Sequence, residues 1–194
     1  MKTPIICPCL AFRTEPRHMK VSVSTISISE LDVDLLIVPI TSEDLTDGLD
    51  ELSDAFGTVI DRARTDVKGE IGDSAVLYPE SGTAKRVILV GIGESSSVDA
   101  ERIRNASALG AEAATHVNAE TVGIAVPSVD LSSDIAAQAL VEGFILGSYR
   151  FNRYRTNDDS GEPAQRLVIQ TTDQDKQVRR GAERGRIVSE AVCS

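Results

Sequence analysis

The sequence has few aromatic residues and no tryptophan. It contains four Phe, three Tyr, two His and three Cys among 194 residues. An odd number of cysteines without zinc-site spacing argues against a disulfide framework or a closed zinc site, and a reducing cytoplasm fits this usage best. The chain also lacks an apolar run long enough to span a bilayer, so we expect no membrane segment.

Basic residues are in the minority. Twenty Lys and Arg stand against 30 Asp and Glu, which gives a formal net charge of −10. An acidic chain without a basic stripe is a poor match for nucleic acid or for an anionic membrane surface. We therefore expect neither as a partner. The length suits one domain with a substantial core.

Common catalytic motifs are absent from the sequence. It contains no His-Glu-x-x-His and no Gly-x-Ser-x-Gly. His18 stands in an aperiodic leader, and His116 is expected on the surface near a helix end. An acidic run falls around a predicted helix and is interpreted as its solvated face: Asp44, Asp47, Asp50, Glu51 and Asp54. Since no nucleophile can be paired with a base, we assign no catalytic, cofactor-binding or metal-binding residue.

One glycine-containing loop occupies the place of a phosphate loop. Residues 91–97, Gly-Ile-Gly-Glu-Ser-Ser-Ser, follow a predicted strand and precede a predicted helix. The third glycine of the dinucleotide fingerprint is missing, and no Gly-Lys-Ser/Thr follows. We interpret the loop as a simple turn from strand to helix, and we expect no ADP-ribose or NAD binding.

Strand-like and helical patterns alternate along the chain. Apolar runs predict strands at residues 21–26, 34–41, 73–79, 86–93, 121–127 and 166–172. Helical periodicity covers residues 42–64, with a break at Gly57, and residues 99–117, 135–156 and 173–194. This alternation predicts an α/β fold with about six strands and helices on both faces of the sheet.

We expect the rest of the fold to pack around the helix predicted over residues 135–156. Its apolar residues recur at helical spacing and predict a wide buried stripe: Ala136, Ala137, Leu140, Val141, Phe144, Ile145 and Phe151. Gly143 and Gly147 lie four residues apart and so share one face. Each glycine costs a helix about 1 kcal/mol relative to alanine, so we expect close backbone contact there.

The same helix carries a family resemblance. Glu142-Gly143, Leu146-Gly147, Tyr149, Phe151 and Tyr154-Arg155 form the pattern E-G-x-x-L-G-x-Y-x-F-x-x-Y-R. This pattern resembles a helix near the end of the N-terminal domain in leucyl (cytosol) aminopeptidases. The strand at residues 86–93 and the run at residues 181–194 are also similar to that family, and the resemblance covers residues 19–194.

The resemblance implies a fold and two domains with separate roles. It implies a three-layer, macro-domain-like unit with a mixed sheet, and a separate catalytic domain that holds two divalent metals, zinc or manganese. The Asn-Thr-Asp-x-Glu-Gly-Arg signature of that catalytic domain has no match here. We therefore expect a disordered leader at residues 1–18, the N-terminal domain at 19–172, and a linker helix at 173–194 leading to a catalytic domain outside this chain.

Function and partners follow from the resemblance as expectations. The parent enzyme would remove N-terminal residues, Leu-like ones preferred, from peptides in the cytoplasm. The chain alone would be inactive and would contribute to packing in a hexamer and to shielding the catalytic domain. An ADP-ribose-type macro domain and a stand-alone scaffold are the alternatives. The thin apolar stripe of residues 173–194 predicts a helix that is frayed or packed against another copy.

Overall fold

The computed structural model describes residues 19–47, 49–153, 163–172 and 176–193. The predicted leader at residues 1–18, with Cys7, Cys9 and His18, lies outside this range. Tyr154 and Arg155 of the family pattern lie outside it as well. Residues 151–153 are described as helical backbone, so the predicted burial of Phe151 also falls outside the described side chains.

All six predicted strands are present and form one mixed sheet. They are β1 (Lys20–Ser24), β2 (Leu35–Thr41), β3 (Ser74–Leu77), β4 (Val87–Gly93), β5 (Thr121–Ala125) and β6 (Arg166–Gln170), in the order β1-β6-β5-β2-β4-β3. Every neighbouring pair is parallel except β3 with β4. Strands β2 and β4 are buried along their whole length, as their unbroken apolar sequences predicted.

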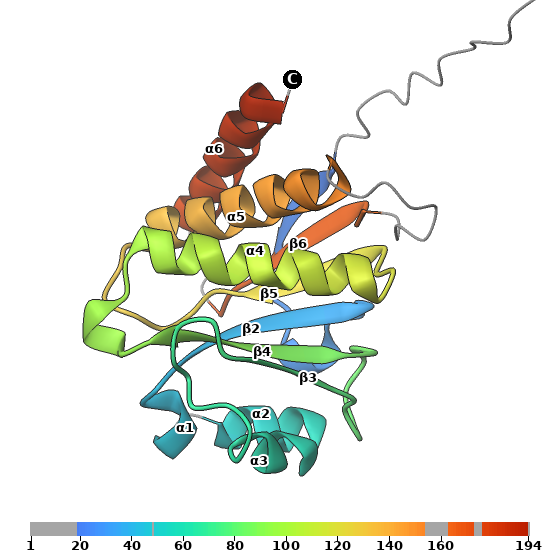
Figure 1. Cartoon of the computed structure of the whole chain (residues 1–194), viewed down its shortest axis with the longest axis vertical. Coiled ribbons are helices and arrows are strands. Elements are labelled where there is room, and N and C mark those ends of the chain that lie inside the picture. Colours follow the sequence, from blue (N-terminus) through green and yellow to red (C-terminus); the bar gives the residue numbers. More distant parts are fainter. Residues whose placement is uncertain (1–18, 48, 154–162, 173–175, 194) are drawn as a thin grey trace, which may run out of the picture.

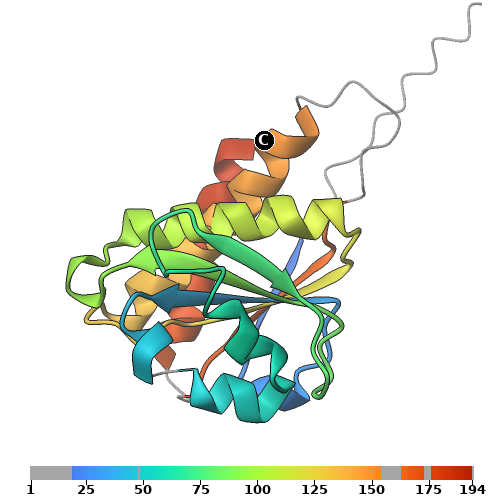
Figure 2. The same ribbon diagram turned by 60° about the horizontal axis from the view of Figure 1, so that its bottom comes forward.

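Helices cover both faces of the sheet. Helices α4 (Ala100–His116), α5 (Ser133–Arg153) and α6 (Lys176–Cys193) lie on one face, and α1 (Asp44–Asp47), α2 (Asp50–Phe56) and α3 (Val59–Ala63) lie on the other (Figures 1 and 2). The predicted break at Gly57 is confirmed, because this residue adopts a φ of 89° between α2 and α3. The three-layer α/β prediction is confirmed.

Each face of the sheet has its own hydrophobic core. The core beneath α4, α5 and α6 includes Ile37, Ile103, Leu140 and Phe144. The core beneath α1, α2 and α3 includes Leu36, Leu49, Phe56 and Ile60. Alternate residues of β2 therefore serve opposite cores, which is the period-two geometry of a central strand.

The predicted inner face of α5 is confirmed by burial. Ala136, Ala137, Leu140, Val141 and Phe144 are each at most 1% exposed. The predicted close contact of its two glycines is confirmed too. A Cβ atom added at Gly143 would lie 2.9 Å from the carbonyl carbon of Arg104 in α4, and one at Gly147 would lie 2.9 Å from the Cα of Ala108.

Helix α6 is packed against α5 of the same chain. Its buried residues are Val178, Gly181, Ala182, Gly185 and Ser189. A Cβ atom at Gly181 would lie 2.7 Å from the carbonyl carbon of Asp134 in α5. The prediction of a frayed helix is wrong, because glycines let the thin stripe approach α5 at backbone distance. Packing against another copy stays a prediction.

Asp34 joins the starts of three strands. Its carboxylate accepts hydrogen bonds from Lys85 Nζ at 2.6 Å and from the backbone N–H groups of Glu120 at 3.1 Å and Thr121 at 2.9 Å. Burial by itself would raise the pKa of Asp34, but these hydrogen bonds outweigh it and lower the pKa below its usual value. The ionised carboxylate is thus favoured in the folded state.

We expect Asp34→Asn to lower the free energy of unfolding by about 1–3 kcal/mol at neutral pH. A lowered folded-state pKa contributes stability that is complete above the unfolded-state pKa of about 3.9 and is lost as pH falls through the folded-state value. The difference in free energy of unfolding between the parent and the Asp34→Asn variant should therefore shrink below about pH 4. Urea melts across this range measure it, with the exposed neighbour Asp32→Asn as control. A difference that stays constant down to about pH 2 would contradict the assignment.

Candidate functional site

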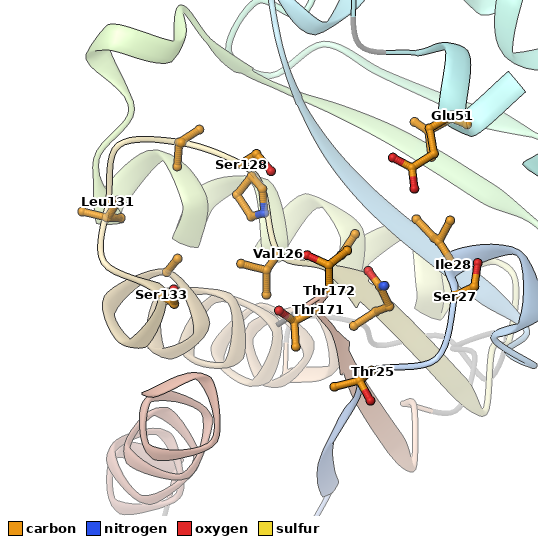
Figure 3. Close-up of a pocket in the computed structure, with 16 residues that line it drawn as sticks. Thr25, Ser27, Ile28, Glu51, Val126, Ser128, Leu131, Ser133, Thr171 and Thr172 are labelled. Atoms are coloured by element: carbon orange, nitrogen blue, oxygen red, sulfur yellow. The ribbon is translucent and has the colours of Figure 1, made fainter. Parts of the chain in front are cut away.

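A cleft opens at the carboxyl ends of β1, β6 and β5. Its volume is about 550 Å³. The walls come from the residues after β1, the start of α2, the loop between β5 and α5, the first turns of α5, and the end of β6 (Figure 3). The lining residues are Thr25, Ser27, Ile28, Glu51, Leu52, Ala125, Val126, Pro127, Ser128, Val129, Leu131, Ser133, Ala136, Gln170, Thr171 and Thr172.

The topology explains why a cleft forms here. Strands β2 and β5 are neighbours, but the helices that follow β2 cover one face of the sheet while α5, which follows β5, covers the other (Figure 1). The connections that follow β2 and β5 therefore leave this edge of the sheet towards opposite faces. Such switch points are where open α/β sheets bind ligands.

The adjacent part of the same edge is closed by the chain itself. Residues around Gly69 cross the carboxyl ends of β2 and β4, and Gly69 accepts a hydrogen bond from Gly93 N at 2.8 Å. A Cβ atom at Gly91 would lie 2.7 Å from the carbonyl carbon of Gly69. This crossing leaves the β1-β6-β5 portion of the edge as the part that forms the cleft.

The loop at residues 91–97 is engaged in contacts within the chain. Gly91 N donates to the Asp73 carbonyl at 2.8 Å, and Ser97 N donates to the Glu94 carbonyl at 3.0 Å. Ser95 N donates to the Glu43 carboxylate at 3.0 Å, and this bond is the main cause of a lowered pKa of Glu43. A phosphate loop needs backbone N–H groups directed at its ligand, whereas here a carboxylate of the chain takes that place.

The lining of the cleft is polar and carries one charged side chain. Hydroxyl groups come from Thr25, Ser27, Ser128, Ser133, Thr171 and Thr172. Glu51 is the charged member, and Figure 3 shows its carboxylate directed towards the cavity. The sixteen lining residues include no Lys, Arg or His. Among the residues that the structure describes, the cleft therefore offers no cation to a phosphate group.

The residues singled out in the sequence do not converge on this cleft, with one exception. His116 is on the surface, as predicted, with a side chain that is 51% exposed and lies 3.8 Å from Glu112. Of the acidic run, Glu51 reaches the cleft, while Asp44 bonds the backbone of Thr41 at the start of α1. Among the described side chains, no three of His, Cys, Asp or Glu are grouped so as to hold a metal ion. No helix in the described ranges is long and apolar enough to cross a membrane.

Glu142, the first residue of the family pattern, has a structural partner. It is 6% exposed, and its carboxylate accepts hydrogen bonds from Arg104 Nε at 3.0 Å and from Gln138 Nε2 at 2.7 Å. Burial opposes the charge on Arg104, but its bonds to Glu142 and Glu101 raise its pKa above the ordinary value. This group links α4 to α5 and lies apart from the cleft.

We expect ADP-ribose and NAD not to bind this chain appreciably. Their diphosphates are usually held by cations or free backbone N–H groups; the sixteen lining residues include no Lys, Arg or His, and the N–H groups of Gly91, Gly93 and Ser97 in the loop are bonded within the chain. Isothermal titration calorimetry of the chain with each nucleotide measures this directly. Micromolar affinity would contradict the prediction and favour the macro-domain alternative.

Comparisons with solved structures agree with the fold. A tomato leucine aminopeptidase mutant superposes with a TM-score of 0.76 at 23% identity, covering 92% of this chain and 37% of that one. A Trypanosoma brucei macrodomain, solved in complex with ADP, superposes with a TM-score of 0.62 at 11% identity over 86% of this chain and 68% of that one. The predicted likeness to a macro domain is therefore confirmed at the level of fold.

Sequence comparisons identify the family. A "Probable cytosol aminopeptidase" of Chlorobium luteolum is 34% identical over 151 residues, covering 74% of this chain and 29% of that protein. A protein of the same description from Chloroherpeton thalassium is 31% identical over 193 residues, covering 88% and 38%. The chain thus spans about a third of the length of these relatives. Residues 37–158 match the description "Cytosol aminopeptidase family, N-terminal domain", and the chain belongs to that family as an N-terminal domain.

Proposed function

We propose that this chain serves as the non-catalytic N-terminal domain of a leucyl-type metalloaminopeptidase. The observation that carries the proposal is the family match over residues 37–158, in a chain that spans 29% and 38% of the cytosol aminopeptidases of Chlorobium and Chloroherpeton. In this proposal, a separate region supplies the two divalent metals, zinc or manganese, that activate water and polarise the peptide carbonyl. The substrates are peptides with free N-termini, and the enzyme is cytoplasmic.

We expect the chain alone to hydrolyse no leucyl amide. In this proposal the metal ligands are provided by the other region, so added Mn²⁺ or Zn²⁺ should not produce turnover. Release of 4-nitroaniline from leucyl-4-nitroanilide measures the activity. Turnover that depends on metal and survives removal of trace contaminants would overturn the proposal.

Helix α6 is proposed to lead into the catalytic region and to contact it. Residues 176–193 would then be the structured part of the linker expected at 173–194, with residues 19–172 as the domain proper. The C-terminal half of α6 extends beyond α5 (Figure 1), and it carries exposed apolar residues at Ile187 (53%), Val188 (41%) and Val192 (66%). Burial of such residues against a second domain is favourable at about 25 cal/mol per Å².

A chimera tests the assembly and shielding role. The chain replaces the N-terminal part of the Chlorobium luteolum relative, and the molecular mass in solution is measured by sedimentation. We propose a hexamer for the complete enzyme, so the chimera should form an assembly larger than a monomer. Lysine at both Val188 and Val192 should weaken the assembly, whereas Gln177→Lys, an exposed polar position on the same helix, should not. Equal behaviour of the two variants would refute a contact at α6.

A further inference from the structure

The cleft at the carboxyl ends of β1, β6 and β5 has no part in the function proposed above. Its volume of about 550 Å³ falls within the range of about 300–1,000 Å³ found for small-molecule sites. It also borders the switch point between β5 and β2, since α2 after β2 and the loop after β5 both contribute to its walls. The chemistry of the lining decides which class of ligand suits it.

Charge excludes one large class of ligands. The lining has a carboxylate at Glu51 and no cationic side chain. Val126 N donates to the Gln170 carbonyl at 2.9 Å, and Leu131 N donates to the Val129 carbonyl at 2.8 Å. Because these N–H groups of the β5–α5 loop are used within the chain, they are not directed at an anion. The lack of a cationic side chain among the described lining residues therefore disfavours phosphates and carboxylates.

The remaining groups favour a donor-rich ligand with positive charge. Hydroxyl oxygens on Thr25, Ser128 and Thr172 accept hydrogen bonds as well as donate them. Apolar surface from Ile28, Leu52, Val126, Val129 and Leu131 lies beside these hydroxyls. A carboxylate, several hydroxyls and a strip of apolar surface together match a primary ammonium group attached to a body with amides and an apolar side chain.

We propose that this cleft binds the free amino terminus of a short peptide, with the ammonium group at Glu51. The choice of a peptide over other amines rests on the proposed function, because peptides with free N-termini are the substrates of such an enzyme. No bond is made or broken at the cleft, since the interaction is binding alone.

The test uses the chain as it stands, labelled with ¹⁵N, and the tripeptide Leu-Gly-Gly. Amide resonances of cleft residues such as Ser128, Thr171 and Thr172 should shift on titration. The N-acetylated tripeptide, which lacks the ammonium group, should bind the parent chain at least about fivefold more weakly than the free tripeptide does. The free tripeptide should bind the Glu51→Gln variant of the chain more weakly by a similar factor. Asp54→Asn removes the same charge from an exposed position of α2 that does not line the cleft, and it should leave binding unchanged.

Several outcomes would overturn the proposal. The first is that no cleft resonance shifts at about 10 mM peptide, a concentration sufficient to detect millimolar affinity. The second is equal binding of the acetylated and free peptides, or no effect of Glu51→Gln. Adenosine, an uncharged ligand with hydroxyls, is the third probe, and tighter binding of adenosine would show that the ammonium is not what the cleft selects. Each of these results leaves the chimera assembly unaffected, so the two proposals fail separately.

Discussion

A Gly143→Ala variant should unfold with a free energy about 3 kcal/mol lower than that of the parent chain. The added Cβ would overlap the carbonyl oxygen of Arg104 and would lie 2.9 Å from its carbonyl carbon and 3.0 Å from its Cα. These are backbone atoms of α4, so no side-chain rotation can relieve the overlap. Relief requires α4 and α5 to separate, and that would open gaps around Ile103 and Leu140 in the core between them and the sheet.

Propensity acts in the opposite direction, which makes the sign informative. Alanine in place of an exposed helical glycine should stabilise a helix by up to about 1 kcal/mol. Gly110→Ala is the matched comparison, because its Cβ would meet the side chain of Ile37 rather than backbone. A side-chain end can shift, so we expect a smaller loss at Gly110 than at Gly143. Leucine at Gly143 should be more damaging than alanine.

Denaturant melts of Gly143→Ala, Gly110→Ala and the parent give the three free energies of unfolding. Against a typical total of about 5–15 kcal/mol, a loss of about 3 kcal/mol is a large share. Asn105→Ala, at an exposed position of α4, controls for helix propensity and should change stability by less than about 1 kcal/mol. A midpoint for Gly143→Ala that is unchanged or raised would mean that α4 and α5 lie further apart than the structure has them.

The same glycine spacing appears twice in the helical layer. Gly143 and Gly147 face α4, and Gly181 and Gly185 face α5, each pair at a spacing of four residues. A Cβ atom at Gly185 would lie 2.7 Å from the carbonyl oxygen of Gln138. Three helices are thus joined side by side through glycine faces. The small residues that weaken each helix in isolation allow the close packing that holds the layer together.

The sequence predicted the elements of this fold well because their patterns are local. The unbroken apolar run of residues 34–41 predicted a central strand, and β2 is that strand. The inner face of α5 and the close contact at Gly143 also followed from helical spacing alone. In the helix at residues 99–117, both Leu109 and Gly110 fit the spacing of an inner face. The structure buries Gly110, while Leu109 is 37% exposed.

The cleft could not be predicted, because its residues are brought together by strand order. Thr25, Glu51, Ser128 and Thr171 follow or flank four separate elements, and no sequence pattern fixes which strands are neighbours. Serine and threonine in loops carry no signal that separates a binding site from an ordinary turn. The crossing of β2 and β4 by the chain around Gly69, which closes the rest of the edge, was missed for the same reason.

Glu142 shows a different limit of the sequence. Its place in the family pattern was recognised, but its partner Arg104 lies 38 residues earlier and on another helix. Nε and Nη2 of Arg104 donate to one carboxylate oxygen of Glu142 at 3.0 and 2.9 Å, while Gln138 donates to the other oxygen. Glu142 is nearly buried, with a side chain 8% exposed, whereas that of Arg104 is 32% exposed. Removing Arg104 and removing Glu142 should therefore have unequal effects on the free energy of unfolding.

Replacing Arg104 by methionine should cost about 3 kcal/mol, because it leaves a buried carboxylate without its cation. Glu142→Met should cost less, about 1–2 kcal/mol, since Arg104 is partly solvated and keeps its ion pair with Glu101. The double variant should resemble Glu142→Met rather than the sum of both changes. A coupling free energy of about 3 kcal/mol between the two positions follows, and a double-mutant cycle from denaturant melts measures it.

A second arginine provides the control for this cycle. The side chain of Arg186 in α6 is 31% exposed, nearly the same as that of Arg104, and it also pairs with two glutamates. Its partners Glu183 and Glu190 are 57% and 27% exposed, so water can replace the arginine. We therefore expect Arg186→Met to change the free energy of unfolding by less than about 1 kcal/mol. Equal losses of stability at Arg104 and Arg186 would show that burial of Glu142 does not strengthen the ion pair between α4 and α5. The unequal roles assigned to the two ion pairs would then be wrong.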